Sequence, residues 1–235
     1  ERHDPNRVGV DAARRPRPKW GVAVTGDDPR PLLPAHAGAL MSLPEIEAAA
    51  KGHGILNAYF ERDGIIRHLP IVSRLAGGGA VNSEVMPSLA AEALRVAQGA
   101  TTYVLRSSGA SGQTAYGEHT GVNQVRIGDA VVPTDGRGRV WLYDTGHVRE
   151  RFVPAWEVLS PEFDRARIEG KIVFVGATAT GLDIRSTPLN LGASGVEVHA
   201  QGAEQMILGD FLERPDWIAG AEVAWLLGLS AALVV

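Results

Sequence analysis

Short apolar runs separated by turn residues fill the middle of the chain. These runs lie at 21–25, 125–127, 130–133 and 140–143. Short runs that are rich in β-branched residues and bounded by Gly-Asp or Asp-Gly pairs predict strands, so we expect one early strand and a later meander. The Asp63-Gly64 pair also lies between two apolar runs, and this arrangement predicts a β-hairpin.

Three segments place apolar residues at helical spacing. They lie at 43–52, 87–97 and 196–208. Pro44 in the first turn of one segment, and Gly99 and Gly209 at the ends of the others, are typical start and stop signals of helices. Because a helix with one apolar face needs a surface to cover, the pattern predicts an α/β fold with a mixed β-sheet flanked by helices.

Lys171 to Val175, which reads KIVFV, is the most continuous β-type run of the chain. A strand that is apolar on both faces is typical of the centre of a sheet. We therefore expect a central strand here, with Val173 and Val175 buried.

Val223 to Val235 carries no charged residue. Crossing the hydrocarbon core takes about 20 apolar residues, so this run is long enough to be the first half of a span. Trp217 and Trp225 lie where an interfacial aromatic belt is expected. We expect one helix over 219–235 that projects from the domain and enters the membrane. The alternative is a buried terminal helix of a soluble protein.

These patterns divide the chain into three parts. Residues 1–20, which are basic and broken by prolines, form an extension or linker, 21–217 form the folded domain, and 218–235 form the start of a transmembrane helix. The first residue is Glu1 rather than Met, and no export signal precedes it, so we expect a piece of a longer protein.

Composition excludes several classes of function. The net charge of −4 over 235 residues gives no overall attraction to nucleic acid. Cys is absent, so the chain can form neither a disulfide nor a thiolate metal site, and it has no thiol nucleophile. Its seven His residues are scattered and include no HExxH motif. We expect no nucleic acid partner, no metal and no cofactor.

Six ordered segments resemble the second type of CHASE domain, a sensory module associated with bacterial cyclases and histidine kinases. They are Gly-His-Gly-Ile-Leu-Asn at 52–57, Asp-Gly-Ile-Ile-Arg at 63–67 with Pro70, Pro-Ser-Leu-Ala at 87–90, and the segments 170–179, 183–188 and 195–200. The resemblance covers roughly 44–217. The chain has Arg67-His68 where members often carry two Arg. The early aspartate-containing strand of the family is not evident before Gly21, so we expect an N-terminally incomplete domain.

The resemblance implies a domain on the periplasmic or extracellular side of the inner membrane of a bacterium. It implies a receptor with membrane helices on both sides of this domain and a cytoplasmic output, first of all a class III nucleotide cyclase, with a histidine kinase as the alternative. The domain would bind an unknown small molecule or protein signal and act as a homodimer. A module that mediates dimerisation without any ligand is a further alternative.

The segment from Gly176 to Thr187 has the densest set of small, hydroxyl and charged residues. A small-residue loop after an apolar run can bring backbone amides to an anion, although a plain tight turn is the alternative. Asp183 and Arg185 lie two apart, so on an extended segment they share a face and pair with each other or hold a polar ligand. The candidate ligand-binding residues are Thr178, Thr180, Asp183, Arg185, Glu197, His199, Asp63 and Arg67.

An enzyme is the rival hypothesis from a different class. Asp183, Glu197 and His199 could form an acid/base or metal constellation behind the Gly176 loop. No GxSxG elbow accompanies them. We therefore expect no catalytic residue in this chain.

Overall fold

The computed structural model describes residues 16–75, 84–110, 121–178, 183–213 and 217–234. Its largest sheet has four strands in the order β1-β6-β7-β8. β1 (Gly21–Thr25) is parallel to β6, and the other pairs are antiparallel. The remaining strands of this sheet are β6 (Thr102–Ser107), β7 (Val122–Ile127) and β8 (Ala130–Pro133). The early strand and the β7-β8 turn of the expected meander are thus confirmed.

Seven further strands form three smaller sheets. β2 (Ala35–His36), β4 (Val72–Leu75) and β5 (Glu84–Pro87) pair in the order β2-β4-β5. β3 (His68–Pro70) pairs with β9 (Arg139–Trp141), and β10 (Ile184–Arg185) pairs with β11 (Ala193–Ser194). The run that ends the expected meander therefore leaves the large sheet and joins β3.

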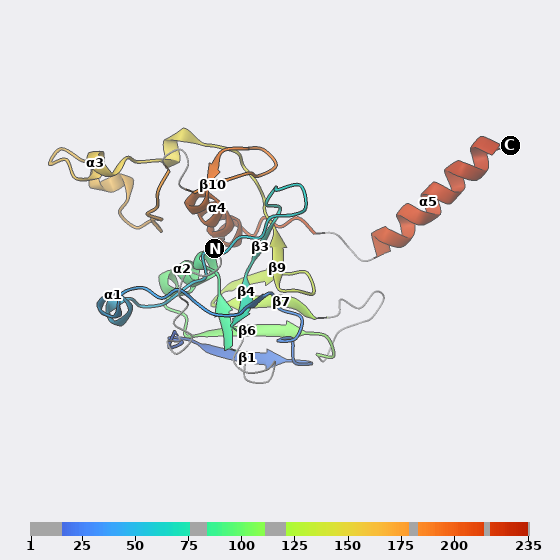
Figure 1. Ribbon diagram of the computed structural model, residues 1–235, viewed down its shortest axis with the longest axis horizontal. Coiled ribbons are helices and arrows are strands. Elements are labelled where there is room, and N and C mark those ends of the chain that lie inside the picture. Colours follow the sequence, from blue (N-terminus) through green and yellow to red (C-terminus); the bar gives the residue numbers. More distant parts are fainter. Residues whose placement is uncertain (1–15, 76–83, 111–120, 179–182, 214–216, 235) are drawn as a thin grey trace, which may run out of the picture.

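Two helices cover the sheets, and three others lie apart from them (Figure 1). α2 (Leu89–Ala97) and α4 (Gly195–Leu208) pack against each other, and they contact β7 and β8 respectively. The other helices are α1 (Pro44–Ala49), α3 (Ala155–Val158) and α5 (Trp217–Val234), with 3-10 turns η2 (Arg149–Arg151) and η3 (Arg165–Arg167). The mixed α/β fold and the three helices expected at 43–52, 87–97 and 196–208 are confirmed.

Local capping explains where the two packed helices begin and end. Ser88 Oγ accepts a hydrogen bond from Ala91 N at 3.3 Å, and Ser194 Oγ accepts one from Glu197 N at 3.4 Å. Such caps satisfy backbone donors that the first turn of a helix leaves without partners. Gly209 ends α4 at φ 76°, a left-handed conformation that favours glycine.

A buried ion pair within α2 is linked to the large sheet through a tyrosine of β6. Arg95 and Glu92, which are 5% and 3% exposed, are joined by two hydrogen bonds of 2.7 and 2.8 Å. The Tyr103 hydroxyl of β6 donates to the same carboxylate at 2.6 Å. Burial, together with this bond to Glu92, raises the pKa of Tyr103 far above its usual value, so the hydroxyl keeps its proton and remains a donor.

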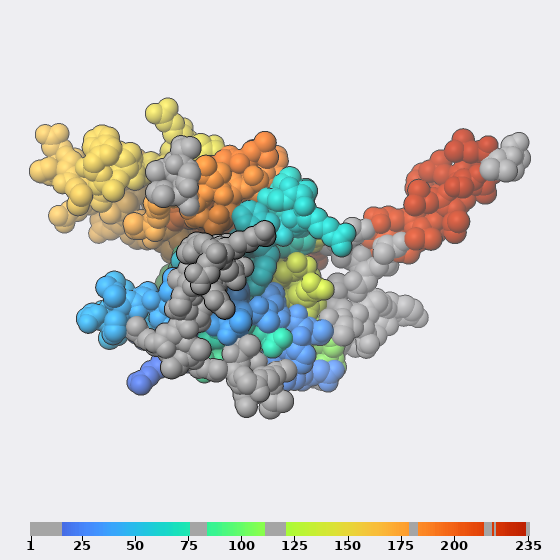
Figure 2. All heavy atoms as spheres, in the orientation of Figure 1, coloured from blue at the N-terminus to red at the C-terminus, as the bar shows by residue number. Residues whose placement is uncertain are grey.

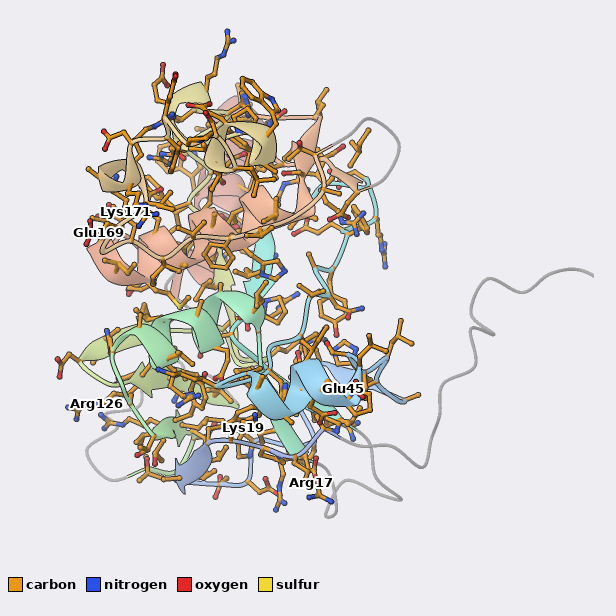
Figure 3. All side chains as sticks on the ribbon, turned by 90° about the vertical axis from the view of Figure 1, so that its left-hand side faces the viewer. Arg17, Lys19, Glu45, Arg126, Glu169 and Lys171 are labelled. Carbon is orange, nitrogen blue, oxygen red and sulfur yellow. The ribbon has the colours of Figure 1, made fainter. Side chains whose placement is uncertain are left out.

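Smaller charged contacts at the surface hold the outer segments. Lys19 Nζ donates to the carbonyl of Glu47 at 2.7 Å and to that of Ala50, so it caps the C-terminal end of α1 (Figure 3). Lys171 Nζ donates to Arg167 O at 2.9 Å, beside Glu169 in the same view. These contacts hold the C-terminal ends of α1 and η3 at the surface.

The expected central strand at 171–175 is wrong. Val173 is 54% exposed and Val175 is 92% exposed, and the segment pairs with no strand among the described residues. Only alternate residues face inward, since Phe174 packs on the core. Gly176 then lies so close to α4 that an added Cβ would come within 2.6 Å of Val196 Cβ. The run therefore leads to α4 at Gly176 instead of joining a sheet, and the centre of the large sheet is made by β6 and β7.

The expected β-hairpin around Asp63-Gly64 is only partly formed. Gly64 makes the turn at φ 79°, and Glu61 N bonds to Ile65 O at 3.1 Å. The arm at 54–59 forms no strand, and β3 pairs with β9 instead. Long-range pairing has thus replaced the local partner that the turn pattern suggested.

The C-terminal run forms one helix, α5, that projects from the domain as expected (Figures 1 and 2). Its large apolar side chains are exposed, including Trp225 at 71% and Leu233 at 82%. Among the described residues, however, no helix has both the length and the apolar character that a membrane crossing requires. Entry of α5 into the membrane is therefore not supported by the structure.

We expect Arg95→Met to lower the free energy of unfolding by about 3 to 5 kcal/mol, because it leaves the Glu92 carboxylate buried without its cation. Urea unfolding followed by circular dichroism measures this change. The matched control is Arg167→Met, which removes the exposed ion pair with Glu157 and should cost at most about 1 kcal/mol. Equal effects of the two substitutions would show that the buried pair has no special role.

Candidate functional site

α4 carries two of the predicted site residues, Glu197 and His199, and Asp183 lies at its start. It carries an unusual number of polar side chains in the interior. Those that are less than a tenth exposed are Glu197, His199, Gln201 and Gln205. Buried polar groups are costly unless they have hydrogen-bond partners, so their partners define what α4 holds in place.

One face of α4 fastens the extended segment 141–147. Glu197, Gln201 and Gln205 are spaced by four residues and so share this face. The Glu197 carboxylate lies 3.1 Å from His147 Nδ1, and Gln201 Nε2 donates to Gly146 O at 3.1 Å. The Gln205 side-chain amide bonds through both of its polar atoms. Its Oε1 accepts a hydrogen bond from Tyr143 N at 2.9 Å, and its Nε2 donates one to Trp141 O at 3.1 Å. The two amides thus supply backbone partners for Tyr143 and Gly146, which lie beyond the end of β9.

His199 lies on a different side of α4. Its Nε2 donates to Leu56 O at 3.1 Å, while Nδ1 is buried with no partner among the described residues. Burial lowers the pKa of His199, against the opposing influence of the Leu56 carbonyl and the Asp183 charge. Burial therefore favours the neutral imidazole, in which the Nε2 proton bonds to Leu56 O.

The pairing of Asp183 with Arg185 agrees with their two-residue spacing. Arg185 Nη2 lies 2.6 Å from Asp183 Oδ1, and each side chain is about one third exposed, at 33% and 38%. The guanidinium carbon of Arg185 lies 5.4 Å from the centre of the Phe60 ring, a cation-π distance. The Asp183 carboxylate also fills the space beside Gly195, where an added Cβ would meet it at 2.1 Å. The pair is thus fixed at the start of α4.

The hairpin residues form a separate charged cluster. Arg67 is 2.8 Å from Asp63 Oδ2 and 2.8 Å from Glu61 Oε2, and Glu61 also lies 2.8 Å from His68 Nδ1. The hydrogen bond from Arg67 lowers the pKa of Asp63, which favours the charged carboxylate. These groups satisfy one another around a turn. Whether Asp63 and Arg67 also contact a ligand stays a prediction.

The structure does not assemble the rival catalytic constellation. Glu197 faces His147 while His199 faces Leu56, so the two side chains leave α4 in different directions. Within the described ranges, no three His, Asp or Glu side chains are grouped so that they could hold a metal ion. Thr178 is exposed, and Thr180 lies outside the described residues, so the proposed anion loop stays a prediction.

Sequence reasoning missed several residues that organise this region. They are Phe60, His147, Gln201 and Gln205. The spacing of Glu197, Gln201 and Gln205 was a visible signal, because three polar residues on one face of an otherwise apolar helix need polar partners. The same spacing does not indicate which segment supplies these partners, and in the structure it is 141–147.

The small residues of the 52–57 motif have a structural role. An added Cβ at Gly52 would lie 1.7 Å from Glu92 Oε1, and one at Gly54 would lie 2.4 Å from Leu89 Cα. Ile55 N bonds to Pro87 O at 2.8 Å. These close contacts fasten the motif to the start of α2 and so hold Leu56 O against His199.

We expect the free energy of unfolding to fall as the pH decreases below 6.5, in part because of His199. In the unfolded chain this imidazole takes a proton near its usual pKa of 6.5, whereas in the folded state its pKa is lowered. Protons then bind the unfolded state preferentially, and the loss of stability continues until the pH reaches the lowered value. Urea unfolding between pH 7.5 and 5 should show a shallower pH dependence for His199→Gln, which keeps a donor for Leu56 O. Identical slopes for parent and variant would contradict this assignment.

Comparison with known proteins supports a single family. The family model for the CHASE2 domain matches residues 1–235, which is the whole chain. No curated protein and no solved structure matches the chain. The chain belongs to the CHASE2 family, whose members are extracellular sensory domains of cyclase and histidine kinase receptors.

Proposed function

We propose that this domain is the sensor of a bacterial transmembrane receptor, placed on the periplasmic side of the inner membrane, and that it regulates a class III nucleotide cyclase in the cytoplasm. Membership of a family found in cyclase and histidine kinase receptors supports the sensory part. A histidine kinase is the alternative output. The chain itself has a sensory and not a catalytic role.

The observation that carries this proposal is the position of α4 between the Asp183-Arg185 pair and α5. The backbone carbonyl of Asp183 accepts a hydrogen bond from Gly195 N at 3.1 Å at the start of α4. Gly209 ends the helix, and residues 210–213 lead toward α5. A packed helix moves as a unit, so a shift at its first turn is transmitted to its last turn.

In this proposal the signal is read at the first turn of α4. Arg185 and Phe60 offer a partly exposed cation and an aromatic ring, and Asp183 adds the opposite charge. A polar ligand that competes for either partner of the ion pair would change the restraint on α4. Thr178, Thr180, Glu197 and His199 belong to the same proposed region.

Exposed apolar side chains favour a second role, a protein contact. Trp156 is 74% exposed, Leu159 is 83% exposed and Val175 is 92% exposed. Exposed apolar groups of this size are common at protein interfaces. We propose a homodimer as the functional state, and a dimerisation module without any ligand is the competing function.

Arg185→Ala in the complete receptor should change the ratio of induced to basal output by about tenfold, which corresponds to the loss of a contact worth about 1.4 kcal/mol. The measurement is cyclic nucleotide production, or kinase activity, under inducing growth conditions. Asp183→Ala should also alter this ratio, because it frees the same guanidinium.

The control for this experiment is Arg167→Ala, which removes an exposed Arg from the ion pair with Glu157, outside the proposed region. Circular dichroism of the isolated domain checks that all three variants remain folded. Parent-like output from both Arg185→Ala and Asp183→Ala, with folded protein, would overturn the proposed position of the signal site.

A further inference from the structure

A small pocket opens at the other end of α4, away from the Asp183-Arg185 pair. Its volume is about 70 Å³, and it lies between the last turns of α4 and the segment 143–151. Its lining includes Tyr143, Arg151, Gln201, Glu204, Leu208 and Asp210. A cavity of this size, with both polar and apolar groups in its lining, can hold several water molecules or one molecule of a few heavy atoms.

Most polar groups in the lining already have partners. Arg151 Nη1 lies 2.6 Å from Glu204 Oε2 and 3.2 Å from Thr145 Oγ1, so the cation and this anion neutralise each other. The Gln205 amide uses its oxygen and its nitrogen to hold the segment 141–143. These groups shape the walls of the pocket and leave little capacity for a ligand.

Two acceptors in the lining have no partner among the described residues. Gln201 is 5% exposed, and its Oε1 is buried with no hydrogen-bond partner among the described residues, although its Nε2 is bonded. The Asp210 carboxylate makes no ion pair or side-chain hydrogen bond within the described part of the chain. A buried acceptor without a donor is costly, so the pocket suits a ligand that brings N–H donors and a positive charge.

We propose that this pocket binds a small organic primary ammonium compound. The ammonium group lies between Asp210 and Gln201 Oε1, and the carbon part lies against the Tyr143 ring and Leu208. The apolar lining favours a cation that carries carbon over a bare metal ion. The absence of a three-residue His, Asp or Glu cluster among the described residues points the same way. An aromatic ring adds attraction for an ammonium group.

Binding at this site would restrain the exit from α4. Asp210 follows the helix-ending Gly209, and its backbone N donates to Gln205 O at 3.1 Å. Leu212 then forms a β-bridge with Trp141, the residue whose carbonyl Gln205 holds. A ligand that ties Asp210 to Gln201 would therefore stiffen the connection toward α5. This consequence for signalling rests on the proposed function, whereas the binding itself does not.

Isothermal titration calorimetry of the 235-residue chain with ethylammonium chloride tests the binding. We expect saturable heat with a dissociation constant in the millimolar range, and no such heat from sodium chloride at equal ionic strength. Tetramethylammonium chloride has the charge without N–H donors and should not bind.

Asp210→Asn should weaken ethylammonium binding by about tenfold or more, because it removes the charge from a charge-assisted hydrogen bond. Asp210 is exposed, so the variant should fold normally. Glu162→Gln, which neutralises an exposed carboxylate outside the pocket, is the matched control and should bind like the parent.

Three outcomes overturn the binding site: no saturable heat with ethylammonium, equal binding of tetramethylammonium, or equal affinities of Asp210→Asn and Glu162→Gln. The receptor assay separates this inference from the proposed function. Binding that leaves receptor output unchanged would contradict the restraint on α5. If receptor output responds to Arg185→Ala while ethylammonium fails to bind, the proposed binding pocket is wrong and the proposed sensory function still stands.

Discussion

A helix that buries a carboxylate, an imidazole and two amides must supply partners for all of them, and α4 depends on this requirement. Desolvating such groups without hydrogen bonds would cost several kcal/mol in a protein whose whole stability is about 5 to 15 kcal/mol. The partners come from two distant segments, 141–147 and Leu56. The polar faces of α4 therefore fix three parts of the chain relative to one another.

The same requirement explains why the segment beside α4 can be extended without belonging to the large sheet. β9 ends at Trp141, and beyond it the backbone of Tyr143 and Gly146 bonds to the Gln205 and Gln201 amides instead of to a strand. The run with the exposed Val173 and Val175 likewise pairs with no strand among the described residues, and Gly176, which follows it, lies against Val196 of α4. The helix, rather than a central strand, organises this half of the molecule (Figure 1).

Both ends of α4 carry candidate functional groups. An ion pair and an aromatic ring lie at the first turn, while a small acceptor-rich pocket lies at the last turn. Both are on one rigid element whose C-terminal exit leads toward the exposed apolar helix α5. In a family of sensory domains, such an element is a natural route from a ligand to an output.

The sequence by itself determined the elements whose signals are local. Ser88, Ser194 and Gly209 mark helix ends through contacts within one or two turns, and the Gly128-Asp129 turn joins β7 to β8. The ordered motifs likewise indicated the family, because that resemblance rests on residue identities and their order along the chain. The pairing of Asp183 with Arg185 followed from a two-residue spacing on an extended segment.

Only the tertiary structure decided what depends on a distant partner. KIVFV has the composition of a buried strand, but a strand exists only when another strand pairs with it, and here the neighbour is α4. Glu197 and His199 look like one constellation in sequence, yet two positions along a helix point about 200° apart and meet different segments. The chemistry of each side chain follows from the sequence alone, whereas its burial and its contact partners depend on the path of the whole chain.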